Sequence, residues 1–243
     1  MSATLSQLPQ STRPDAARRT SRGTALRVLL VCGVVYPVLY FLAADGIAAT
    51  LYHGYSRMDQ AVSELSGTAA PTRWFLTAML PVYTALVVAF GIGVRRSAAE
   101  GPRALRVTGD ILVAWGLAGL LWLPFPMSSR EDVVKGEPMS VNDIGHLVMS
   151  GLTLVLIMSA LWFGAKAFGG RFRLYSIITA VTVLIFGFLM STQAPNVPDP
   201  TPWMGLYERV MMWAWFLWMA GLAIILLQTR RDTPRRAGTA TSD

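Results

Sequence analysis

Residues 174–190 read LYSIITAVTVLIFGFLM, a run of 17 residues without a charged side chain. Arg171 and Arg173 stand directly before this run. An α-helix rises about 1.5 Å per residue, so a run of this length approaches the thickness of a bilayer hydrocarbon core, about 30 Å. The stretch therefore predicts a helix that crosses a membrane.

Five further apolar runs of similar length occur along the chain. The six predicted spans are Ala25 to Ala44, Trp74 to Val94, Ala104 to Leu123, His146 to Phe168, Leu174 to Met190 and Tyr207 to Gln228. Only 14% of the 243 residues are charged, against about 25% in soluble domains, and 53% are hydrophobic. We predict an all-α integral membrane protein, a six-transmembrane-helix antiparallel bundle over residues 25–228, which excludes the soluble globular classes.

The basic residues predict the orientation of the bundle. Sixteen of the 21 lysines and arginines lie in the two terminal segments and the two short connections on the same side, and five lie on the other side. Because Lys and Arg accumulate in cytoplasmic flanks, both termini are predicted to be cytoplasmic, in the cytoplasmic membrane of a bacterium. The same placement argues against a nucleic-acid partner. The polar, basic segments 1–24 and 229–243 are predicted to be disordered cytoplasmic tails.

Three longer connections on the opposite, outer side hold most polar residues other than arginine. They cover residues 45–73, 124–145 and 191–206. Binding and catalytic residues are found disproportionately on loops that a rigid scaffold positions. We therefore expect any functional site on the outer face, assembled from residues far apart in the sequence.

Four outer residues are candidates for catalysis: His146, Asp143, Glu64 and Glu208. Asp143 and His146 are three residues apart at a helix start, so their side chains can share a face. A functional His146 would face the bundle interior, hydrogen-bonded to Asp143, Glu64 or Glu208, which would set its tautomer. The alternative is that Asp143 caps the helix while His146 faces water or headgroups.

The ligand-binding candidates are Arg73, Trp203, Glu208 and Arg209. Partly buried charges at a lipid boundary need partners, so Arg73, Glu64, Glu208 and Arg209 are expected to meet over the outer end of the bundle. Metal and cofactor sites are not predicted, because glycine-rich phosphate loops, GxSxG, HExxH and CxxC motifs are absent from the sequence. Gly116, Gly119 and Gly151 are expected to let helices approach closely.

Four segments carry a resemblance to a known family. They are Gln60-Ala61-Val62-Ser63-Glu64-Leu65 with Ala70-Pro71-Thr72-Arg73, the pair Asp143 and His146, Phe172-Arg173-Leu174-Tyr175-Ser176, and Pro202-Trp203-x-Gly205-Leu206-x-Glu208-Arg209. In this order they resemble the bacterial membrane-protein family catalogued as domain of unknown function 998, over residues 26–228. The resemblance implies a compact helical membrane bundle and no particular activity.

Three functions stay open at this point. The favoured hypothesis is a non-enzymatic membrane protein that binds a lipid or a membrane partner at its outer face, with a homo-oligomer also compatible. The second is a membrane-embedded hydrolase or lipid-modifying enzyme that uses the outer Asp, His and Glu residues. The third, a small transporter, rests on Asp110, an acidic residue about six residues into the third span, and on Pro37 and Pro81 within two other spans.

The topology can be tested with reporter fusions. An alkaline phosphatase fused after Asp243 should be inactive and a fluorescent protein at the same position active, because the C-terminus is predicted to be cytoplasmic. A phosphatase inserted in the connection 191–206 should show the reverse pattern. An externally exposed Asp243 would contradict the orientation derived from the basic residues.

Overall fold

Six long helices make up the computed structural model, which describes residues 13–99, 101–134, 137–194, 197 and 199–237. They are α1 (Arg13–Phe41), α3 (Arg73–Ser97), α4 (Arg103–Ala118), α5 (Val141–Ala167), α6 (Gly170–Gln193) and α7 (Met204–Ala237). With short extensions of α1 and α4, all six are long and apolar enough to cross a membrane, which confirms the predicted fold class.

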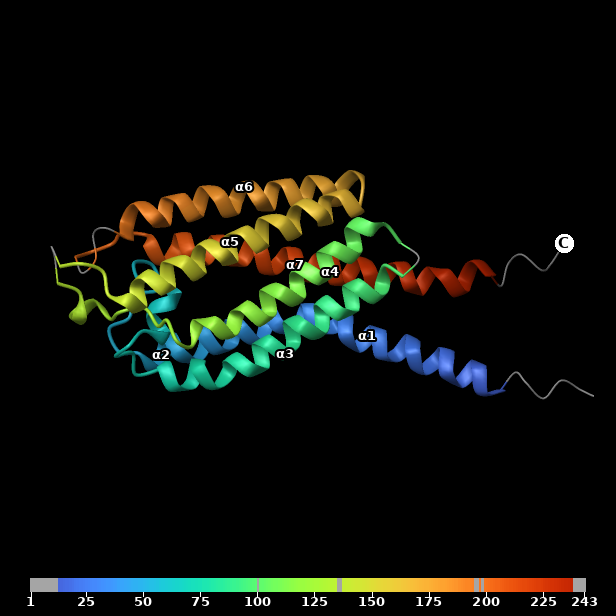
Figure 1. Ribbon diagram of the computed structural model, residues 1–243, viewed down its shortest axis with the longest axis horizontal. Helices are drawn as coiled ribbons and strands as arrows, with labels where there is room; N and C mark the ends of the chain where they lie inside the picture. Colours follow the sequence, from blue (N-terminus) through green and yellow to red (C-terminus); the bar gives the residue numbers. More distant parts are fainter. Residues whose placement is uncertain (1–12, 100, 135–136, 195–196, 198, 238–243) are drawn as a thin grey trace, which may run out of the picture.

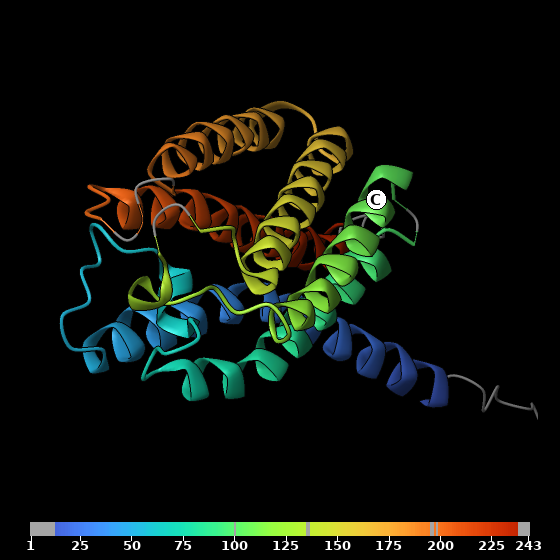
Figure 2. The same cartoon turned by 60° about the vertical axis from the view of Figure 1, so that its left-hand side comes forward.

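The helices form a closed antiparallel bundle (Figure 1). Each helix packs against the next along the chain, and α7 packs against both α6 and α1, which closes the circuit. Figure 2 shows this arrangement after a rotation, with α5 and α6 on one side and α1 and α3 on the other. The described ends of α1 and α7 lie at one end of the bundle, called the terminal end here; the three long connections lie at the other, the loop end.

The span boundaries differ most from prediction at the loop end. The first span continues past Ala44 to Leu51, through a π-helical segment (Leu42–Ala48) and the short helix α2 (Ala49–Leu51). The fourth begins at Val141 rather than His146, because the Ser140 side chain accepts the Asp143 N–H and caps α5.

Helix also extends into both predicted tails. The helix α1 begins at Arg13, and α7 continues to Ala237. Residues 1–12 and 238–243 lie outside the described part of the chain. The predicted disorder of the two tails stays a prediction.

Tryptophan side chains of α7 fill the middle of the bundle. Trp215 and Trp218 are buried and stacked, with ring centroids 5.2 Å apart. The Trp218 indole donates a 2.8 Å hydrogen bond to Oγ of Ser176, which joins α7 to α6. Buried indole N–H groups usually have such a partner. This contact therefore fixes the rotation of α7 relative to α6.

Glycines let α3 and α4 cross with their backbones nearly in contact. A Cβ added at Gly109 of α4 would lie 2.6 Å from the Arg95 nitrogen and 2.8 Å from the Gly91 oxygen, both backbone atoms of α3. Gly116 also meets α3, as expected, through the side chain of Val87. The expectation for Gly151 is wrong, because nothing lies within 4 Å of a Cβ built there.

Gly109 and Gly151 form a matched pair for a packing test. Gly109→Ala should destabilise the bundle by about 1–3 kcal/mol, because its methyl group would overlap backbone that cannot move independently. Gly151→Ala should be neutral or stabilising by up to about 1 kcal/mol, since alanine is the better helix former. Thermal unfolding in one detergent compares them, and equal midpoints would contradict the close crossing.

Candidate functional site

The three long connections fold over the loop end as a single layer, which we call the loop cap. Its described residues are 45–72, 124–134, 137–140 and 199–209. Regular secondary structure among them is limited to the end of the first span, the first residues of α7 and two short 3-10 helices, η2 (Val62–Ser66) and η4 (Arg130–Asp132). Side-chain hydrogen bonds therefore have to hold these connections together.

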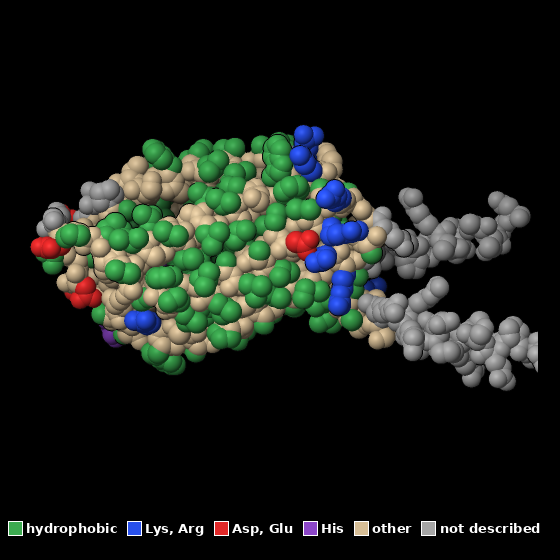
Figure 3. Space-filling view, in the orientation of Figure 1, with side chains coloured by type: hydrophobic (Ala, Val, Ile, Leu, Met, Phe, Trp, Pro, Cys, Tyr) green, Lys and Arg blue, Asp and Glu red, His purple; other side chains and the backbone are tan. Residues whose placement is uncertain are grey.

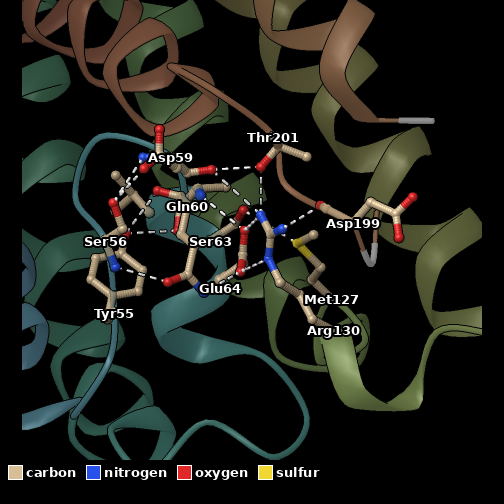
Figure 4. Close-up of polar contacts among 12 residues, drawn as sticks. Tyr55, Ser56, Asp59, Gln60, Ser63, Glu64, Met127, Arg130, Asp199 and Thr201 are labelled. Atoms are coloured by element: carbon tan, nitrogen blue, oxygen red, sulfur yellow. Dashed lines mark hydrogen bonds and ion pairs between the residues drawn. The ribbon is translucent and has the colours of Figure 1, made fainter. Parts of the chain in front are cut away.

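Glu64 and Arg130 join the first connection to the second. Arg130 Nε donates to Glu64 Oε2 over 2.7 Å and Nη2 to Oε1 over 2.8 Å, a bidentate pair (Figure 4). Glu64 also accepts hydrogen bonds from the Ala61 N–H and the Gln60 amide. The pKa of Arg130 lies above its ordinary value, chiefly because of the hydrogen bond to Glu64. That bond outweighs the opposing effect of burial.

Arg130 also reaches the third connection. Its guanidinium donates to Oγ1 of Thr201 over 2.7 Å and to the Asp199 carbonyl over 3.1 Å. Thr201 in turn donates a 2.6 Å hydrogen bond to the Asp59 carbonyl. Figure 4 shows the Arg130 side chain lying between segments of all three connections. One guanidinium therefore links the whole cap.

Arg209, one turn into α7, is the second arginine whose hydrogen bonds join several segments of the cap; we call this group of contacts the Arg209 centre. Its Nε and Nη2 donate to Asp45 Oδ1 over 2.8 and 2.7 Å. Nη1 donates to the carbonyls of Arg57, Gln60 and Gly205. Asp45 lies in the π-helical segment, whose wider turn belongs to a geometry often found at functional sites. This buried arginine ties α7 to the first span and the first connection.

Tyr55 contacts the Arg209 guanidinium through both its hydroxyl and its ring. Its hydroxyl accepts a 3.0 Å hydrogen bond from Arg209 Nη2 and donates to the Ala61 carbonyl over 2.8 Å. The guanidinium also lies over the Tyr55 ring, 5.7 Å from its centroid. Burial raises the pKa of Tyr55, and the nearby Arg209 opposes that rise. The tyrosine therefore stays a neutral hydrogen-bonding partner.

Glu208, next to Arg209 in the chain, also joins α7 to the first connection. Its carboxylate is buried and accepts the backbone N–H of Val62, the first residue of η2. Gly205, one turn earlier, lets the Leu206 N–H donate to the Met58 carbonyl over 3.0 Å. A Cβ on Gly205 would clash with the carbonyls of Gln60 and Arg57, the latter at 2.6 Å. The start of α7 and the first connection therefore meet backbone to backbone.

The structure brings only some of the predicted site residues together. Glu64, Glu208 and Arg209 all lie in the loop cap, but each pairs with a group that the sequence did not single out. Arg73 pairs with none of them: its Nη1 donates to the Thr68 carbonyl over 3.3 Å, and no carboxylate of the described residues pairs with it. Trp203 has a φ of +66° and an exposed side chain, and its N–H donates to Asp59.

His146 adopts neither of the two predicted arrangements. Its Nδ1 lies 3.1 Å from the Phe125 carbonyl, and its ring meets Trp122 edge to face. Within the described residues no hydrogen bond joins it to Asp143. The Asp143 carboxylate accepts instead from the backbone and side chain of Ser128 and from Ser140. Asp143 thus ties the second connection to the start of α5.

The partners that the sequence analysis missed are Asp45 and Arg130. A signal was available for Arg130, because arginine is scarce on the predicted outer side and a charge retained there is expected to have a partner. Asp45 directly follows the first predicted span, where the sequence alone suggests a solvated residue. Among the described residues, no three His, Cys, Asp or Glu side chains group as metal ligands do.

Asp110 forms an ion pair near the other end of the bundle. It pairs with Arg95 of α3 over 2.8 Å, and the two side chains are 46% and 59% exposed. This places Asp110 at the surface of the bundle, paired across the α3–α4 contact. The Glu64 and Arg130 side chains, by contrast, are only 4% and 17% exposed.

These two ion pairs provide a stability test. Arg130→Gln should destabilise the protein by about 3–5 kcal/mol, because it leaves the Glu64 carboxylate buried without its counter-charge. Arg95→Gln, at the exposed pair with Asp110, should cost no more than about 1 kcal/mol. Chemical unfolding in detergent measures both variants. Similar losses would show that Arg130 contributes no more than a surface charge does.

Comparison with known proteins identifies the family of this chain but indicates no function. Neither the curated proteins nor the solved structures yield a match. One family model matches residues 34–225, which covers all six spans in part or whole and the entire loop cap. The chain therefore belongs to the family described as protein of unknown function (DUF998).

Proposed function

We propose that this protein acts by binding rather than by catalysis. In this proposal it holds a phospholipid of the outer leaflet at the loop end, with Arg73 on the phosphate. The observation that carries the proposal is an arginine at the start of α3 that has no carboxylate partner among the described residues and lies beside an exposed tryptophan.

The catalytic candidates already have structural partners. Glu64 accepts hydrogen bonds from Arg130, Gln60 and Ala61, and Asp143 accepts from Ser128 and Ser140. A general base or nucleophile needs an oxygen that can reach a substrate. Carboxylates held in this way act as ties between segments, which favours a binding function over hydrolysis.

Arg73, the half-buried first residue of α3, differs from Arg130 and Arg209 of the cap. Arg130 and Arg209 each donate to a carboxylate and to several carbonyl or hydroxyl groups, whereas Arg73 forms one hydrogen bond to a carbonyl. A guanidinium has five N–H donors in a planar fork that matches phosphate. Arg73 therefore has donors to offer a lipid phosphate.

The neighbour of Arg73 supports a lipid as the ligand. Trp74 is 70% exposed, in the first turn of α3. Tryptophan side chains prefer the headgroup level of a membrane, where an apolar ring can meet both chains and water. Arg73 would then lie at phosphate depth. Trp203, also exposed, marks the same end of the bundle on the third connection.

One observation keeps a second function in consideration. The Phe125 carbonyl can only accept, so Nδ1 of a neutral His146 carries the proton and Nε2 carries a lone pair. A carbonyl that orients a histidine in this way is a common feature of bases and metal ligands. A membrane-embedded hydrolase that uses His146 is therefore the alternative.

Native mass spectrometry of the full chain extracted in mild detergent tests the proposal. The chain should retain a phospholipid, and Arg73→Gln should lose most of it because the phosphate loses its guanidinium. Arg57→Gln is the matched control: Arg57 is also a loop-end arginine bonded to one carbonyl, that of Asp45. Retention that is equal in the two variants, or absent from the unaltered chain, would refute binding at Arg73.

The variant His146→Ala distinguishes the binding proposal from the hydrolase alternative. Under the binding proposal it leaves lipid retention unchanged. Under the alternative, the unaltered chain hydrolyses a phospholipid supplied in mixed micelles and His146→Ala does not. Hydrolysis that depends on His146 would replace the binding proposal.

A further inference from the structure

Exposed cations surround much of the terminal end of the bundle. Eight described side chains contribute: Arg27 on α1, Arg95 and Arg96 on α3, Arg103 and Arg106 on α4, Lys166 on α5, and Arg171 and Arg173 on α6. We call this set the basic rim, and Figure 3 shows cationic side chains gathered at that end of the molecule. Of the side chains described there, Asp110 is the one carboxylate, and it pairs with Arg95. Among the described side chains, the rim therefore has a net positive charge.

A tryptophan fixes the depth of the rim relative to a membrane. Trp162 of α5 is 60% exposed, and the Lys166 ammonium lies 4.6 Å from its ring centroid. The cation–π contact holds the ammonium beside a ring that prefers the headgroup layer. This preference of Trp162 favours a position of Lys166 near the lipid phosphates.

The turn between α5 and α6 brings further cations to the same level. Helix α5 ends at Ala167 and α6 begins at Gly170, whose φ of +57° allows the reversal within two residues. Arg171 and Arg173 follow at once and are exposed. Lys166 and these two arginines thus flank one tight turn of two helices that pack together.

The surface next to this turn is apolar. On α6, Leu174, Ile177 and Ile178 are 59%, 50% and 55% exposed and come directly after the two arginines. A soluble polyanion would pair with the cations but would make no contact with this apolar face. A lipid offers a phosphate for the arginines and acyl chains for the leucine and isoleucines, so the combination fits a phospholipid.

We propose that the basic rim binds an anionic phospholipid at the α5–α6 turn, with Lys166, Arg171 and Arg173 around its headgroup. The ligand class is a phospholipid with net negative charge, because three cations that have no carboxylate partner within the described part of the chain favour it over a zwitterionic lipid. Each Lys or Arg near a membrane surface contributes about 1 kcal/mol toward an anionic lipid, about a fivefold change in affinity. This site is independent of the one proposed around Arg73 at the opposite end.

Brominated lipids test the site in the full chain. The chain is reconstituted in vesicles of phosphatidylcholine with increasing phosphatidylglycerol, and bromine on either lipid quenches nearby tryptophan. The difference between the unaltered chain and Trp162→Phe isolates the Trp162 signal. We expect brominated phosphatidylglycerol to quench Trp162 at a lower mole fraction than brominated phosphatidylcholine, and less so in high salt, which screens exposed charges.

Variants then assign the residues. Arg171→Gln with Arg173→Gln should abolish the preference for phosphatidylglycerol, whereas Arg171→Lys with Arg173→Lys should retain most of it and shows that the turn still folds. Arg73→Gln, at the loop end, should leave it unchanged, so the two proposals fail separately. Equal quenching by the two lipids, or a preference that survives the double glutamine variant, would overturn the proposal. Loss of the preference with millimolar inorganic phosphate would identify a free anion rather than a lipid as the ligand.

Discussion

The hydrogen bonds of Arg209 to Asp45 hold the loop end of the molecule in place. Arg209 lies one turn into α7 and Asp45 lies in the π-helical segment of the first span, so their contact joins the last span to the first at the loop end. The same guanidinium bonds to carbonyls of the first connection and to Tyr55. Glu208 adds a bond to the start of η2 from the adjacent residue. These bonds add to the packing of Val62 and Leu65 against the first span, which also holds the first connection on the bundle.

Arg130 and Arg209 hold together a cap that has little regular secondary structure. Arg130 unites the three connections, and Arg209 unites the cap with the helices. A buried charge that loses its partner is costly, so alternative packings of these connections are disfavoured more strongly than exposed pairs could achieve. Asp110 and Arg95, which are exposed, lack this effect. We interpret the acidic residues of the cap mainly as structural ties.

The two ends of the bundle differ in how their charges are used. At the loop end, the carboxylates of Glu64, Asp45 and Asp143 have partners within the chain, and Arg73 is left with a single carbonyl bond. At the terminal end the cations of the basic rim outnumber the described carboxylates. Both proposed sites follow from the same reasoning, that arginines without acidic partners at headgroup depth can hold lipid phosphates.

The sequence by itself determined the six spans, their antiparallel order and the family, because a membrane requires long apolar helices and the hydropathy of each run is a local property. It also identified Glu64, Glu208 and Arg209 as residues of one region. Only the tertiary structure decided their partners, since Arg130 lies 66 residues from Glu64 and Asp45 lies 164 residues from Arg209. The position of His146 against the Phe125 carbonyl depended in the same way on how the second connection folds. Such pairings are set by the packing of distant segments, which no local pattern encodes.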